Sequence, residues 1–145
     1  MDTPTGAYDR AMSLHPIPYT ARSVSSPAGY SHAMQAGGLI FVSGQVAFDT
    51  HGSVVGVGDI GEQARQAFRN LGAVLEAAGA SYPDVVKLTY FVRDIEAVGA
   101  IRAARDEFVN TANPPASTLV EVSRLFAPEL LIEIEAVAIV PQPAE

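Results

Sequence analysis

The most informative stretch of the chain is residues 130–140, which read LLIEIEAVAIV. Successive side chains of a β-strand point to opposite faces, so residues two apart share a face. In this stretch one face is apolar without interruption, being made of Leu130, Ile132, Ile134, Ala136, Ala138 and Val140. The other face sets Glu133 beside Glu135 among Leu131, Val137 and Ile139. The stretch therefore predicts a strand with one core face and one apolar face that carries two carboxylates.

Three further strands and two helices are predicted upstream. Residues 39–46 (LIFVSGQV), 85–92 and 116–122 are rich in β-branched and aromatic residues and lie next to Gly, Pro or Asp turns. Apolar residues recur at helical spacing over 60–78, behind the capping residue Asp59, and again from 95 to about 110, behind Asp94. In the strand 85–92 the alternation assigns to one face Val86, Leu88, Tyr90 and Val92.

This order of elements predicts an α+β sandwich in which two helices cover one face of a mixed sheet. The uncovered face keeps large apolar side chains such as Phe41, Phe91 and Ile139, and another subunit is the natural candidate to cover it. At 145 residues the chain has room for one domain, which we place at residues 21–145. Residues 1–20 are rich in Pro, Thr and small residues and are predicted to form an extended N-terminal arm.

The composition disfavours several classes of function. The chain has no cysteine, which excludes thiolate chemistry, and its three histidines are widely spaced, so we expect no metal site. A net charge of −7, with one lysine and eight scattered arginines, disfavours nucleic-acid binding. Residues 1–20 lack the features of a secretory signal, and no apolar run reaches about 20 residues. We therefore expect a cytoplasmic protein that does not bind membranes.

Five segments, in order and spacing, resemble the reactive-intermediate deaminase family, known as Rid or YjgF: LIFVSGQV, EQARQAFRNLGAVLEAAGA, DVVKLTYFVRDI, PPASTLVEVSRL and IEIEAVAIV. The resemblance covers roughly residues 28–140. It implies a chorismate-mutase-like fold that assembles as a homotrimer, with ligand clefts between subunits. It also implies hydrolysis of small enamine and imine intermediates, such as 2-aminoacrylate, to 2-keto acids and ammonia, with no cofactor or metal.

The resemblance also assigns residues to this cleft. Glu133 falls on the family glutamate that positions the attacking water, while Tyr30, Ser43 and Gly44 fall on substrate-binding positions. If Glu133 lies in an apolar cleft, desolvation would raise its pKa and suit it to proton transfer. For Ser43 an alternative is a hydrogen bond to strand backbone, and for Tyr30 an alternative is simple packing.

The arginine with which the family grips the substrate carboxylate is missing. Ser117 takes its position in PPASTLVEV, followed by Thr118, and a serine cannot supply a charged, bidentate grip. We therefore expect either a substrate that is not a simple 2-imino acid, or one whose carboxylate is held by Arg102 on the second helix. The predicted cleft thus contains Arg102, Ser117 and Thr118 besides the residues above.

Three functions are compatible with these observations. The first is hydrolytic deamination or tautomerisation of a small reactive enamine or imine. The second is a non-catalytic protein that keeps the cleft and binds a small ligand or protects other proteins. The third is endoribonuclease activity, an annotation long attached to the family, which the net charge of −7 and the lack of a basic stripe disfavour.

Overall fold

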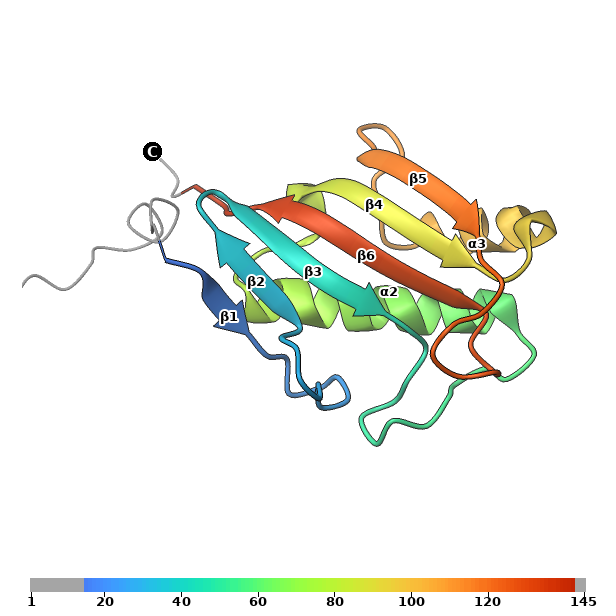
Figure 1. Ribbon diagram of the computed structural model, residues 1–145. Coiled ribbons are helices and arrows are strands. Elements are labelled where there is room, and N and C mark those ends of the chain that lie inside the picture. The colour runs from blue at the N-terminus through green and yellow to red at the C-terminus, as the bar shows by residue number, and fades with distance from the viewer. Residues whose placement is uncertain (1–14, 143–145) are drawn as a thin grey trace, which may run out of the picture.

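The computed structural model describes residues 15–142, which form one mixed sheet with two α-helices against it (Figure 1). In spatial order the six strands are β1 (Ile17–Tyr19), β2 (Ala33–Ala36), β3 (Leu39–Gln45), β6 (Ile132–Ile139), β4 (Val85–Val92) and β5 (Ala116–Glu121). Only β4 and β5 run parallel to each other, and every other neighbouring pair is antiparallel. The predicted α+β fold class is confirmed.

The long helix α2 (Ile60–Ala77) begins where the capping residue predicted it, with the Asp59 side chain accepting from the backbone N–H of Glu62 at 3.1 Å. The second predicted helix is shorter than its apolar pattern suggested. Asp94 caps only a 3₁₀ turn, η2 (Ile95–Ala97), and Ala97 has a non-helical ψ of 5°, so the α-helix α3 spans Val98–Arg105. A second 3₁₀ turn, η1 (Tyr82–Asp84), leads into β4.

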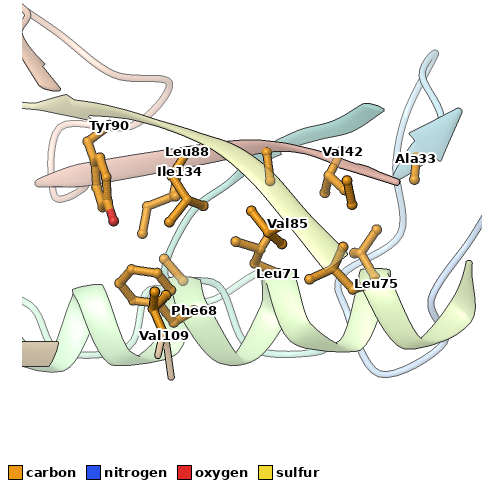
Figure 2. Packing of buried hydrophobic residues seen from close by; sticks show 14 of the residues in the cluster. Ala33, Val42, Phe68, Leu71, Leu75, Val85, Leu88, Tyr90, Val109 and Ile134 are labelled. Atoms are coloured by element: carbon orange, nitrogen blue, oxygen red, sulfur yellow. The ribbon is translucent and has the colours of Figure 1, made fainter. Parts of the chain in front are cut away.

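The core lies between the sheet and α2. Phe68, Leu71 and Leu75 of α2 point toward the sheet, where Leu88 and Ile134 meet them (Figure 2). The predicted core face of β6 is confirmed, since every apolar residue assigned to it is buried. Burial of this many aliphatic and aromatic side chains is the main stabilising contribution, at roughly 1.5–3 kcal/mol for each large side chain.

One prediction about the strands was wrong in detail. Val86 was assigned to the same face as Leu88, Tyr90 and Val92, which are buried, but it is 43% exposed and Val85 is buried instead. The pairing of β4 with β6 shifts register between Val85 and Lys87, and this bulge exchanges the faces of the first two residues. Within the predicted N-terminal arm, residues 17–19 form β1, an edge strand on β2, while residues 1–14 lie outside the described part.

The second face of the sheet is covered by neither helix and is strongly apolar. Its exposed residues include Leu39 and Phe41 of β3, Val120 of β5 and Ile139 of β6, each between 39% and 47% exposed. We call this surface the open face. Within residues 15–142, neither helix combines the length and apolarity needed to span a bilayer.

Candidate functional site

The predicted glutamate lines a cavity with a volume of about 670 Å³. Glu133 of β6 meets Tyr30, from the loop before β2, and Gly44, near the end of β3. Three of the seven predicted site residues are therefore brought together here. We call this cavity the Glu133 pocket.

Gly44 is the residue that makes room for the carboxylate. A Cβ at position 44 would overlap the Glu133 carboxylate, lying 2.7 Å from Cδ and 2.9 Å from Cγ. Carbon atoms in contact normally sit about 3.5–4.0 Å apart, so no larger residue fits unless the carboxylate moves. The glycine after Ser43 therefore sets where the acid group lies, because β3 and β6 are neighbouring strands.

The pKa of Glu133 is raised above that of an ordinary carboxyl group. Partial burial is the main cause, since it penalises the charged form, and the nearby negative charge of Glu135 adds to the effect. The effect of Glu135 follows from β6, which places the two carboxylates on the same face. A carboxyl group with a raised pKa is suited to exchanging a proton with a substrate near neutral pH.

The loop that carries Tyr30 is held by a buried histidine and by Ser43. The ring of His32 accepts a hydrogen bond from the Ala21 N–H at Nδ1 (3.0 Å), so Nε2 carries the proton that it donates to the Ser25 carbonyl (2.9 Å). The Ser43 hydroxyl donates to the Ser31 carbonyl at 2.6 Å. Ser43 therefore anchors the residue next to Tyr30, and its side chain is not among those that line the pocket.

Two buried amides hold the other walls. Asn70 of α2 donates to the carbonyls of Val46 and Phe48, both at 2.9 Å, and so fixes the loop after β3. Gln63 of α2 donates to the Glu129 carbonyl and accepts from the Leu131 N–H, both at 2.8 Å. The loop that leads into β6, and hence into Glu133, is thus tied directly to the core helix.

The remaining predicted residues lie elsewhere on the same chain. Ser117 and Arg102 line a second cavity of about 270 Å³ between β5 and α3, which we call the Arg102 pocket. Thr118, one residue further along β5, pairs with Thr89 and accepts a hydrogen bond from Lys87 Nζ at 2.6 Å on the open face. None of these three residues lines the Glu133 pocket.

Several lining residues were missed by the sequence analysis. Phe48 and the 89% exposed Phe126 add apolar surface to the Glu133 pocket. Tyr90 and Arg105 line the Arg102 pocket. Alternation correctly placed Tyr90 on the helix-covered face but could not show that a cavity adjoins it.

The described residues contain no group of three or more His, Asp or Glu side chains placed to hold a metal ion. The polar side chains of the Glu133 pocket include one carboxyl group, Glu133, the imidazole groups of His32 and His51, and the phenol of Tyr30. The Arg102 pocket is lined by two guanidinium groups, of which that of Arg105 is paired with Asp106.

Known proteins of similar sequence cover nearly the whole chain. Residues 20–140 match the model of the family described as Endoribonuclease L-PSP. A RutC family protein of Synechocystis sp. is 37% identical over 123 residues, which make up 84% of this chain and 94% of that protein. A 2-iminobutanoate/2-iminopropanoate deaminase of Salmonella typhimurium is 35% identical over 125 residues, covering 83% of this chain and 96% of the relative.

Solved structures are similar over the same region. The YjgF gene product of Escherichia coli superposes with a TM-score of 0.76 at 33% identity, covering 85% of this chain and 98% of that one. A Rid family protein of Yersinia pestis gives a TM-score of 0.82 at 31% identity, covering 87% and 100%. Family model, relatives and folds agree with the resemblance carried by the sequence segments, and the chain therefore belongs to the Rid/YjgF family, the family described as Endoribonuclease L-PSP.

Proposed function

We propose that this protein is an imine deaminase that hydrolyses a small, reactive enamine or imine in a cleft between the subunits of a homotrimer. The observation that carries the proposal is the half-buried Glu133 carboxyl group, with its raised pKa, held against Gly44 in a pocket that also contains Tyr30. Relatives named 2-iminobutanoate/2-iminopropanoate deaminase, at about 35% identity, support this chemistry.

The distribution of the site residues over one chain supports a cleft shared between copies. Glu133 and Tyr30 line one pocket, whereas Arg102 and Ser117 line another on the far side of the sheet from the open face. In this proposal the open face is buried against neighbouring copies, which removes its exposed apolar side chains from water. The Arg102 pocket is lined by the edge strand β5, and in this proposal that edge of one copy lies beside the Glu133 pocket of the next, where the two pockets complete the cleft.

The reaction needs only water and the groups of this cleft. An enamine substrate first tautomerises to the imine, as its carbon takes a proton from water and its nitrogen loses one to water. Water then attacks the C=N carbon while the Glu133 carboxylate accepts one of its protons, and the C=N π electrons move to nitrogen. Glu133 returns that proton to nitrogen, which gives the carbinolamine. The hydroxyl proton of the carbinolamine then passes through Glu133 to nitrogen, the C–N bond breaks as C=O forms, and ammonia leaves. The products are a carbonyl compound and ammonia, and Glu133 ends in its starting state.

The substrate grip differs from that of arginine-bearing family members. Ser117 stands at the family's arginine position. In this proposal Arg102 supplies the positive charge from α3 that Ser117 cannot supply from β5. A hydrogen-bonded contact between the Arg102 guanidinium and the substrate carboxylate would then replace the contact that the family's arginine makes.

The proposal is tested by an imine-hydrolysis assay. An amino-acid oxidase generates a panel of imines, semicarbazide traps them, and the protein is scored for diverting imine to keto acid. We expect activity in the wild type and its loss in Glu133→Gln, which keeps the size of the side chain but cannot accept the proton. Full activity in Glu133→Gln would overturn the role of Glu133. Binding of substrate analogues without turnover in the wild type would instead identify a ligand-binding member of the family.

The assembly is tested separately by light scattering of the purified protein. We expect a trimer, and Phe41→Glu on the open face to dissociate it, because the substitution would bury a charge at each interface. A stable monomer in the wild type would exclude the shared cleft.

A further inference from the structure

The hydroxyl group of Tyr90 is a buried polar group without a partner. Tyr90 is 3% exposed, and its hydroxyl has no hydrogen-bond partner among the described residues. Buried hydroxyl groups in folded proteins almost always have such a partner, because water is lost on burial and must be replaced. This hydroxyl therefore calls for an explanation that the core packing does not supply.

The ring of Tyr90, in contrast, is fully accounted for. It meets the Phe68 ring edge to face, with centroids 6.1 Å apart, in the aromatic cluster between the sheet and α2 (Figure 2). A phenylalanine would make the same contact. The hydroxyl adds nothing to that packing and makes the burial of the side chain less favourable.

Tyr90 also lines the Arg102 pocket, beside the guanidinium groups of Arg102 and Arg105. Burial raises the pKa of the Tyr90 hydroxyl to about 12; the charge of Arg105 opposes this rise and that of Asp106 adds to it. At neutral pH the hydroxyl therefore keeps its proton and is available as a hydrogen-bond donor. Tyr90, a hydrogen-bond donor, and Arg102, a cation, thus line the same cavity, and both groups favour an anionic ligand.

The charges of this pocket indicate how many anionic groups it takes. The Arg105 guanidinium is paired with Asp106, Nη2 to Oδ1 at 2.7 Å, so most of its charge is neutralised. Arg102 is the lining cation that has no carboxylate partner among the described residues. One unpaired cation matches a single carboxylate better than a dicarboxylate or a phosphate.

We propose that Tyr90 is a substrate-binding residue, whose hydroxyl donates a hydrogen bond to the carboxylate of a monocarboxylate substrate held by Arg102. This inference rests on the proposed function, in which the Arg102 pocket forms one half of the cleft. It adds a donor from β4 to a carboxylate grip that the family places on β5, where this chain has Ser117. The grip is thereby built from a neutral donor on the sheet and a cation on α3.

The test measures binding of 2-oxobutanoate, a keto-acid product analogue, by calorimetry on the intact assembly. Loss of a hydrogen bond to a charged group should raise the Kd by about tenfold or more in Tyr90→Phe. The neutral probe 2-oxobutanamide should bind more weakly to the wild type and show no further loss in the variant. Tyr19→Phe is the matched control, because it removes a hydroxyl that donates to Gln35 at 2.9 Å on β1.

The outcomes separate this inference from the proposed function. A raised Kd in Tyr90→Phe, with Tyr19→Phe binding like the wild type, supports the inference even if no imine is turned over. An unchanged Kd in Tyr90→Phe, accompanied by a higher Tm, overturns it and shows that the hydroxyl is only a cost to stability. Failure of the wild type to bind 2-oxobutanoate also overturns it, whatever the imine assay gives. Turnover lost only in Glu133→Gln supports the proposed function alone.

Discussion

Replacing Gly44 by alanine should abolish most of the activity while leaving the protein folded. The added Cβ would lie 2.7 Å from Cδ and 2.9 Å from Cγ of Glu133. Carbon–carbon contacts require about 3.5–4.0 Å, so the Glu133 side chain has to withdraw by about 1 Å. The carboxylate yields more readily than the backbone of β3 does, because the clash is with the far end of a flexible side chain.

The expected loss follows from the displacement. Misplacing a reacting group by about 1 Å costs on the order of 100-fold in rate, which is about 2.7 kcal/mol of transition-state stabilisation. Stability should change little, because Gly44 is not among the glycines with positive φ and alanine can adopt its backbone conformation. We expect Tm to move by less than about 5 °C.

The assay is kcat/KM for imine hydrolysis, with thermal unfolding measured on the same preparations. Gly38→Ala is the matched control, since a Cβ at Gly38 meets nothing within 4 Å and its φ is also not positive. The control should retain wild-type activity. Gly44→Ala with activity within about twofold of the wild type would show that the position of the Glu133 carboxylate does not limit the reaction, and the reasoning would fail.

Four further changes test the electrostatics and the scaffold. Glu135→Gln removes the charge that helps to raise the pKa of Glu133, so the acidic limb of the pH profile of kcat/KM, which rises as Glu133 loses its proton, should move to lower pH. Because the folded state binds that proton more tightly than the unfolded chain does, the raised pKa destabilises the fold once both forms are ionised. Glu133→Gln should accordingly raise Tm at neutral pH and leave it unchanged in acid. An increase of Tm in acid alone would contradict the conclusion that ionised Glu133 destabilises the fold. Gln63→Leu should lower the free energy of unfolding by at least about 1–3 kcal/mol, because it leaves the buried N–H of Leu131 unpaired; urea unfolding measures this, and an unchanged midpoint would contradict it. Phe68→Ala should cost about 3–5 kcal/mol in the same assay, since the side chain is fully buried, and a loss below about 1 kcal/mol would contradict the described core.

Local patterns predicted most of the fold. The 3.6-residue period located α2, the capping residue Asp59 located its start, and strict alternation identified the buried face of β6. The short strands β1 and β2 were missed because three or four residues carry too little pattern to distinguish them from loops. Val86 was misplaced because alternation counts residues, whereas a bulge between β4 and β6 inserts one.

Site residues were harder to predict than elements. The family resemblance singled out Glu133, Tyr30 and Gly44, and these residues do lie in one pocket. It did not show that the Ser43 hydroxyl would donate its hydrogen bond to the Ser31 carbonyl in a loop. Nor could it show that Tyr90 lines a cavity or that its hydroxyl is buried without a partner among the described residues, since both depend on neighbours contributed by other elements.

The sequence by itself therefore determined the order of the elements, the apolar core face and the presence of two adjacent carboxylates, because these depend only on residue type and short-range periodicity. Tertiary structure alone decided which of those groups meet. Pairing of β3 with β6 brings Gly44 against Glu133 and so sets the position of the carboxylate. Strand order and register, which arise from contacts between distant segments, also place Arg102 and Ser117 in a separate pocket of the same chain.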